Sequence, residues 1–106
     1  MNRIAQKGDK VKIHFVAQLE SGHKVDMSQS KPFEIILGRG QVIPGLDDMV
    51  SQMKVGQKVQ AIIPPKLAYA DKGVCLDEDK GGECLIKPGA TLVYDILLKK
   101  SSIPPP

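Results

Sequence analysis

The feature that most restricts the fold is the alternation of apolar and polar residues in several short segments. In residues 10–20 the apolar members are Val11, Ile13, Phe15, Ala17 and Leu19. Residues 91–99 repeat this spacing, and shorter versions occupy 33–37 and 59–63. A period of two belongs to strands with one buried face and one wet face. We therefore expect a sheet that is mainly antiparallel.

A single segment has the spacing of a helix. Its apolar stripe consists of Leu46, Met49, Val50 and Met53, at i, i+3, i+4 and i+7. Pro44 suits the first turn, Lys54 the last turn, and Gly56 the position after the end. A helix this short is marginal alone in water, so it must pack on the sheet. The predicted fold class is α+β, with a curved antiparallel β-sheet wrapped around one short α-helix.

The remaining segments are connections and ends. Pro64-Pro65 stops a strand, because proline cannot continue a central ladder. A long loop is expected over 66–89, with a possible helical turn around residues 67–69. The 106 residues, of which 42% are hydrophobic, suffice for one core. We expect an N-terminal extension at 1–7, one domain at 8–100 and an unstructured tail at 101–106.

Charge and composition argue against several kinds of partner. The net charge is +3 and the lysines are scattered among acids, so nucleic acid is not an expected partner. No apolar stretch approaches the roughly 20 residues that a membrane helix needs, so no membrane is expected either. The first ten residues are polar and contain no secretory segment.

A search for reaction chemistry finds no nucleophile motif, phosphate loop or metal-ligand cluster, so no cofactor and no metal are expected. The loop GRGQVIPG lacks the third glycine of a dinucleotide signal. His14 falls on the polar face of its strand and His23 in a turn, so both are expected in solvent. Asp47 and Asp48 point apart on a helix and are better explained as complements of its dipole.

Apolar residues gather instead in loops, at element ends and at sheet-facing positions. They are Phe15, Val25, Phe33, Val42, Ile43, Leu46, Tyr69, Ile86 and Tyr94. Each of them, taken alone, is more often part of a core than of a site.

The order of the segments is more specific than their composition. The chain contains, in sequence, KIHF, KVD, KPFEIILGRGQVIPGLDDMV, MKVGQK, IPPKLAYADKG and LIKPGATLVYDILL. Together they resemble the FKBP-type peptidyl-prolyl cis-trans isomerases, the immunophilins that bind macrolides, over nearly the whole chain. The resemblance implies a twisted antiparallel sheet around one short helix, in agreement with the periodicity. It also implies a monomeric isomerase that acts on Xaa-Pro bonds in peptides or proteins and assists folding.

The resemblance also implies a pocket. Its expected members are Phe15, Val25, Asp26, Phe33, Val42, Ile43, Leu46, Tyr69, Ile86 and Tyr94. Within that set, the backbone N–H of Ile43 and the hydroxyl of Tyr69 are expected to donate hydrogen bonds to ligand carbonyls. With Asp26, these two are the implied catalytic residues.

This sequence departs from the family where aromatic residues are usual. Phe15 stands for a common Tyr, Val25 for a Phe and Leu46 for the Trp at the pocket floor, while Gln41 replaces a common acid. The loop after Asp26 is shorter, which can remove a basic partner. Loss of aromatic wall predicts weakened isomerase activity and reduced macrolide affinity. The alternative is a non-catalytic module that binds proline motifs for docking or as a chaperone.

Two cysteines lie in the long loop. Eight residues separate Cys75 from Cys84, and the glycines between them let the chain double back. The run GGECLI resembles members of the family from the chloroplast thylakoid lumen, which implies a disulfide here and a lumenal location. The alternative is two reduced thiols in a cytoplasmic protein.

Overall fold

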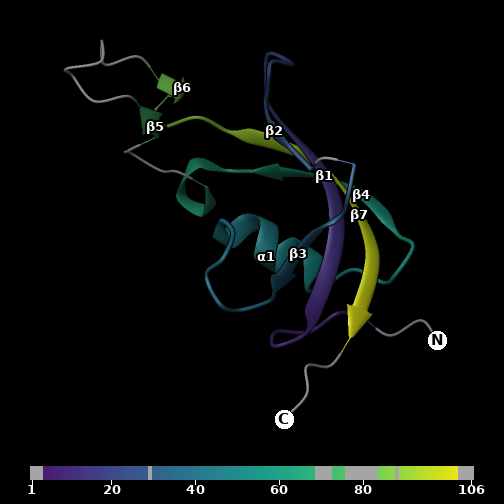
Figure 1. The fold of residues 1–106 in the computed structure, drawn as a ribbon. Coiled ribbons are helices and arrows are strands. Elements are labelled where there is room, and N and C mark those ends of the chain that lie inside the picture. The colour runs from purple at the N-terminus through teal and green to yellow at the C-terminus, as the bar shows by residue number, and fades with distance from the viewer. Residues whose placement is uncertain (1–3, 29, 69–72, 76–83, 88, 103–106) are drawn as a thin grey trace.

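The computed structural model describes residues 4–28, 30–68, 73–75, 84–87 and 89–102. The main sheet comprises β1 (Lys10–Leu19), β2 (Lys24–Met27), β3 (Phe33–Ile36), β4 (Lys58–Ile63) and β7 (Leu92–Ser102). Its path is β2-β1-β7-β4, and β3 pairs with β1 beside β2. Every pairing is antiparallel, and the sheet curves around a single short helix (Figure 1). The predicted α+β class is confirmed.

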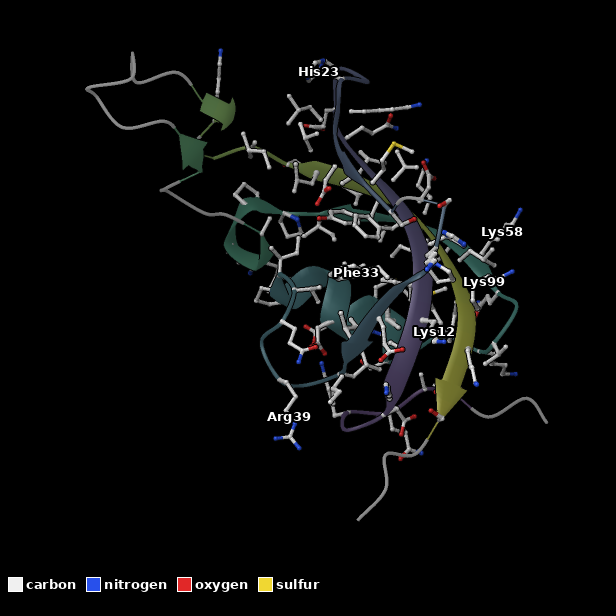
Figure 2. The ribbon with its side chains drawn as sticks, viewed as in Figure 1. Lys12, His23, Phe33, Arg39, Lys58 and Lys99 are labelled. Atoms are coloured by element: carbon white, nitrogen blue, oxygen red, sulfur yellow. The ribbon has the colours of Figure 1, made fainter. Side chains whose placement is uncertain are left out.

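The core lies on the inner face of this sheet. Ile13 lies opposite Leu98, Phe15 opposite Ile96, and Ala17 opposite Tyr94 in the β1–β7 pair. All six side chains are buried, as the alternation in β1 and β7 predicts. Lys12, Lys58 and Lys99, in contrast, project from the sheet away from the helix (Figure 2).

Helix α1 (Pro44–Val50) covers the inner face and contacts β4 and β7. Leu46, Val50 and Met53 are buried, as the apolar stripe predicts. The expected end of the helix is wrong, because α1 stops at Val50 and a turn carries Met53 into the core. Lys54 instead forms a bridge with Ile4, and Gly56 donates its N–H to Leu98 in β7. Contacts with residues distant along the chain are thus found where a further helical turn was expected.

Helix α1 packs closely against β4 at Gly45. Gly45 is buried at the start of α1, and a Cβ built on it would lie 2.4 Å from Cγ2 of Ile63. Real Cβ atoms do not approach neighbours this closely. The helix can therefore sit at this depth only because residue 45 has no side chain.

The region expected to be one long loop contains regular structure. The helical turn appears as η1 (Pro65–Leu67), close to the expected position. Beyond it, β5 (Val74–Cys75) and β6 (Cys84–Ile86) pair as a small antiparallel sheet, so the expectation of a plain loop is wrong there. The two strands are too short to show alternation in the sequence.

The packed structure extends past the expected domain limits at both ends. Ala5 is fully buried and donates its N–H to the Met53 carbonyl at 2.9 Å, while β7 continues to Ser102. No helix among the described residues is long and apolar enough to cross a membrane.

We expect Gly45→Ala to lower the free energy of unfolding by about 2 kcal/mol, because the new methyl group collides with Ile63. The helical preference of alanine over glycine, worth at most about 1 kcal/mol, only partly offsets this effect. Guanidinium denaturation measures the change. In an Ile63→Ala background the same substitution should cost little or become stabilising. An equal cost in both backgrounds would show that this contact is not the cause.

Candidate active site

A cavity of about 410 Å³ opens between β1, β2, the start of β3 and the N-terminal end of α1. Seven residues expected in the pocket line it together: Phe15, Asp26, Phe33, Val42, Ile43, Leu46 and Tyr94. They come from β1, β2, β3, β7, α1 and the segment before α1, so only the folded chain assembles them. We call residues 38–43, which join β3 to α1, the pocket loop.

Three buried side chains form the closed end of the cavity. Phe15 and Tyr94 stack with their ring centroids 5.8 Å apart, and Leu46 lies beside them with only 2% of its surface exposed. The register of β1 and β7 makes the two rings diagonal neighbours, since Phe15 pairs with Ile96 and Tyr94 pairs with Ala17. The floor of the cavity is thus apolar, and the core behind it excludes water.

Phe33 forms the rim. It begins β3, on the same face as the buried Ile35, yet 43% of its surface remains exposed. Its ring meets that of Phe15 edge-on, with centroids 5.9 Å apart, and Figure 2 shows it on the side of β3 that faces α1. An apolar ring held half in water at a cavity mouth is placed to cover an apolar ligand.

The pocket loop supplies a polar group to the wall. The carbonyl of Ile43 accepts the N–H groups of Leu46 and Asp47, each at 3.1 Å, and so begins α1. Within the described residues, the N–H of Ile43 itself makes no hydrogen bond. A backbone donor without an internal partner beside an apolar cavity can serve a ligand carbonyl.

Asp26 and Gln41 lie at the open side of the cavity and are exposed. The carboxylate of Asp26 accepts the N–H of Met27 at 2.8 Å and forms no ion pair with any described residue. The amide oxygen of Gln41 accepts the N–H of Ile36 at 2.9 Å, which ties the middle of the pocket loop to β3. Gln41 therefore acts on the shape of the loop.

Three residues expected in the pocket are not among the described residues that line the cavity. Val25 is half-buried against the core but does not line the cavity, because a β-bulge leaves it as the extra residue of β2 opposite β1. Ile86 is buried in the core and is also absent from the lining. Tyr69 lies outside the described residues.

Several lining residues were not foreseen: Met27, Ser28, Lys31, Pro32 and Gln41. Most belong to the polar segment between β2 and β3, where no periodicity marks an inner face. Ser28 has a further task, since its hydroxyl lies 3.1 Å from the N–H of Phe15 and 3.0 Å from Nδ1 of His14. His14 is accordingly half-buried, so the expectation that it lies free in solvent is wrong, whereas His23 is exposed.

A second cavity, of about 560 Å³, lies on the other face of the sheet. It is lined by outward-facing side chains such as Val16, Gln60 and Leu97, and it holds no pair of aromatic rings. The smaller cavity is therefore the better candidate, because an apolar floor, an aromatic rim and the residue with an unpartnered N–H, Ile43, all line it within the described residues.

Two described residues outside the cavity lining have shifted pKa values. The hydrogen bond from Lys7 to Asp47 raises the pKa of Lys7, and the hydrogen bond from Lys10 lowers the pKa of Glu34. Neither pair lines the cavity. Among the described residues, no three His, Cys, Asp or Glu side chains are grouped so that they could hold a metal ion.

A curved antiparallel sheet around a short helix, with a small apolar cavity at the helix start, defines an α+β domain with one candidate ligand-binding site. The chain matches the sequence model of the FKBP-type peptidyl-prolyl cis-trans isomerases over residues 1–99, and it belongs to this family of isomerases.

Individual relatives agree with this assignment. The chain is 36% identical over 97 residues to the peptidyl-prolyl cis-trans isomerase Fkbp12 of Drosophila melanogaster, covering 90% of this chain and 82% of the relative. It is 41% identical over 100 residues to the chloroplastic isomerase FKBP13 of Arabidopsis thaliana, covering 87% of this chain. The chain spans about half of that relative, with 47% of its length covered.

Solved structures show the same fold. The crystal structure of AtFKBP13 superposes with a TM-score of 0.86 at 36% identity, covering 95% of this chain and 85% of the other. A peptidyl-prolyl cis-trans isomerase from Pseudomonas syringae gives a TM-score of 0.78 at 27% identity, covering 96% and 68%.

We expect Phe33→Ala to weaken the binding of a Leu-Pro tetrapeptide about fivefold to tenfold, because it removes the half-exposed ring at the cavity mouth. The loss of stability should stay below about 1 kcal/mol, since much of the ring is already in water. A titration followed by amide NMR shifts measures the affinity. Ile62→Ala is the matched control, as Ile62 is 69% exposed and away from the cavity. Equal affinities for the two variants would remove Phe33 from the binding surface.

Proposed function

We propose that the chain isomerises Xaa-Pro bonds in its 410 Å³ cavity, as a monomer that assists protein folding, with lower turnover than members with an aromatic pocket. The observation that carries this proposal is that Phe15, Leu46 and Tyr94 line one cavity together with Ile43. Within the described residues, the N–H of Ile43 makes no hydrogen bond. The proposed substrates are proline-containing peptide or protein segments, which the apolar floor and rim suit.

The reaction requires no covalent step. A peptide bond is planar because resonance gives it double-bond character, and the barrier to rotation is about 18–20 kcal/mol. Xaa-Pro bonds consequently interchange in tens to hundreds of seconds. In the twisted transition state, conjugation is lost and the carbonyl is less polar than in the planar amide. An environment that binds this twisted form better than the planar one accelerates the rotation.

The cavity offers two means of achieving that preference. Its apolar floor replaces water around the proline ring and the amide, which disfavours the more polar planar form. The Ile43 N–H is fixed at the start of α1 and can hold a carbonyl of the substrate in one orientation. Each 1.4 kcal/mol or so of preferential binding gives tenfold in rate. We propose Asp26 at the open side and Tyr69 as further participants in catalysis.

Leu46 and Phe15 are the physical basis for a reduced rate. Leu46 closes the floor, but it presents less surface than the Trp common in the family, and Phe15 brings no hydroxyl into the cavity. The same loss of aromatic surface supports reduced affinity for macrolides, which are larger than a proline ring. Binding of a macrolide is consequently proposed to be weak.

A protease-coupled assay with an Xaa-Leu-Pro-Phe tetrapeptide tests the isomerase directly. We expect slow but measurable acceleration by the natural chain, and a severalfold higher kcat/KM after Leu46→Trp, because the larger floor excludes more water. Because the floor is buried, the indole can cost about 1–3 kcal/mol, and thermal unfolding must show that the variant is folded. Val25→Phe is the second variant to compare. It adds an aromatic side chain at the β-bulge of β2, where residue 25 does not line the cavity.

A non-catalytic docking module is the second candidate. Phe33 and Met27 leave 43% and 48% of their surfaces exposed beside the cavity, which suits the docking of a partner's proline motif. Peptide binding without acceleration, even at high protein concentration and in the Leu46→Trp variant, would favour docking over catalysis.

The proposed location of the protein rests on its relatives. The likeness to the chloroplastic FKBP13 of Arabidopsis thaliana supports a chloroplast protein, and the run GGECLI supports the thylakoid lumen within that organelle. The cytoplasm is the alternative. A disulfide between Cys75 and Cys84 belongs to the first location, because oxidising compartments sustain such bonds.

The backbone supports this disulfide. Cys75 and Cys84 are directly opposite each other in the β5–β6 pair. Opposite residues of an antiparallel pair have Cα atoms about 4.5–5.5 Å apart. This spacing falls within the range of about 4.4–6.8 Å that disulfides occupy. Closure of the hairpin would stiffen β6, which ends at the buried Ile86.

We expect the chain, purified without reductant, to resist alkylation, and to gain two alkyl groups after reduction, as mass spectrometry would show. The bond should raise the free energy of unfolding by less than about 3 kcal/mol, because the loop it closes is short. Cys84→Ser provides the control with one permanently free thiol. Complete alkylation without reductant would refute the disulfide and leave the isomerase proposal untouched.

A further inference from the structure

We infer that Lys7 is a positioning residue for the isomerase site, although it lies outside the cavity: it fixes both ends of the pocket loop through Asp47. This inference rests on the proposed function for its effect on catalysis. Its structural part, the restraint of residues 38–43, can be measured independently of any activity.

The first contact between Lys7 and the helix is an ammonium group shared by two carboxylates. Nζ of Lys7 donates to Oδ1 of Asp47 and, at 2.9 Å, to Oδ1 of Asp48. The Asp47 side chain is only 7% exposed, whereas that of Asp48 is 56% exposed. A carboxylate so far removed from water needs a charged partner and hydrogen bonds to be tolerated. Lys7 supplies the charge, so the interaction with Asp47 matters more than that with Asp48.

Asp47 in turn holds the pocket loop at both ends. Its second carboxylate oxygen accepts the N–H of Gly38, the first residue of the loop, at 2.8 Å. Its backbone N–H donates to the carbonyl of Ile43, the last residue of the loop, at 3.1 Å. One residue thus spans the six-residue segment whose final N–H is the proposed substrate donor.

The stem of Lys7 also packs on the start of the loop. A Cβ built on Gly38 would lie 3.3 Å from Cβ and 3.4 Å from Cδ of Lys7, and the φ of Gly38 is +82°. The backbone of Lys7 is held on both sides, since Ala5 and Gly8 donate N–H groups to Met53 and Leu37. The backbone around Lys7 is therefore restrained before the side chain reaches Asp47, so the contact removes side-chain freedom only.

The positive charge of Lys7 is maintained under ordinary conditions. The hydrogen bond to Asp47 raises the pKa of Lys7. A raised pKa means that the contribution to stability is fully present below the ordinary lysine pKa and is lost as pH rises through the raised one. The loop restraint is therefore expected to persist throughout the neutral range.

Lys7→Met tests the inference, because methionine keeps the stem over Gly38 and removes only the ammonium. We expect kcat/KM in the protease-coupled assay to fall about fivefold, as the Ile43 N–H becomes less well placed. Hydrogen exchange of the Gly38 amide should accelerate, and the amide NMR signals of Val42 and Ile43 should shift, relative to the natural chain. Lys7→Arg, which keeps both the charge and the stem atoms, should restore all three readouts to within about twofold.

Lys10→Met is the matched control. It removes the same charge and an ion pair, to Glu34 at 3.0 Å, but it touches no residue of the pocket loop. It should leave the exchange of the Gly38 amide and kcat/KM unchanged. Unaltered Gly38 exchange in Lys7→Met, or equal effects of Lys7→Met and Lys10→Met, would overturn the inference. An inactive natural chain would instead refute the proposed catalysis, and the exchange data would still decide whether Lys7 restrains the loop.

Discussion

The pairing of β1 with β7 is the interaction on which the rest of the structure depends. It runs from Lys10 to Leu19 in β1 and places Phe15 and Tyr94 on one inner face. The other edge of β1 carries β2 and β3 in succession, and β4 is attached through β7. The floor and two walls of the cavity are thus consequences of one long antiparallel pair. Displacing either central strand would separate the rings.

The site combines rigid and less rigid parts. Phe15, Leu46 and Tyr94 belong to regular elements that pack in the core, whereas Val42 and Ile43 belong to a connection without regular structure. That connection is nevertheless restrained at Gly38, Gln41 and Ile43 by hydrogen bonds to neighbouring elements. An isomerase must hold a rotating amide without forming a bond to it, so the placement of weak contacts decides its rate.

The sequence predicted the features that arise from local repetition. Alternation located β1, β3, β4 and β7, and the i, i+3, i+4 stripe located α1. Resemblance to a family then identified residues such as Phe33 and Leu46, which periodicity alone would assign only to the core. What escaped depends on partners distant along the chain. Lys54 pairs with Ile4 and does not extend α1, and the Lys7–Asp47 contact spans forty positions. Neither leaves a periodic signal.

The missing side chain at Gly45 governs the depth of the cavity. Since α1 already rests against Ile63, the helix cannot retreat toward β4 to make room for a larger neighbour. Any bulk added at Leu46, the next residue, must consequently extend toward the cavity mouth. Substitutions at residue 46 would therefore change the volume that is open to a proline ring, while the surrounding sheet and helix keep their positions.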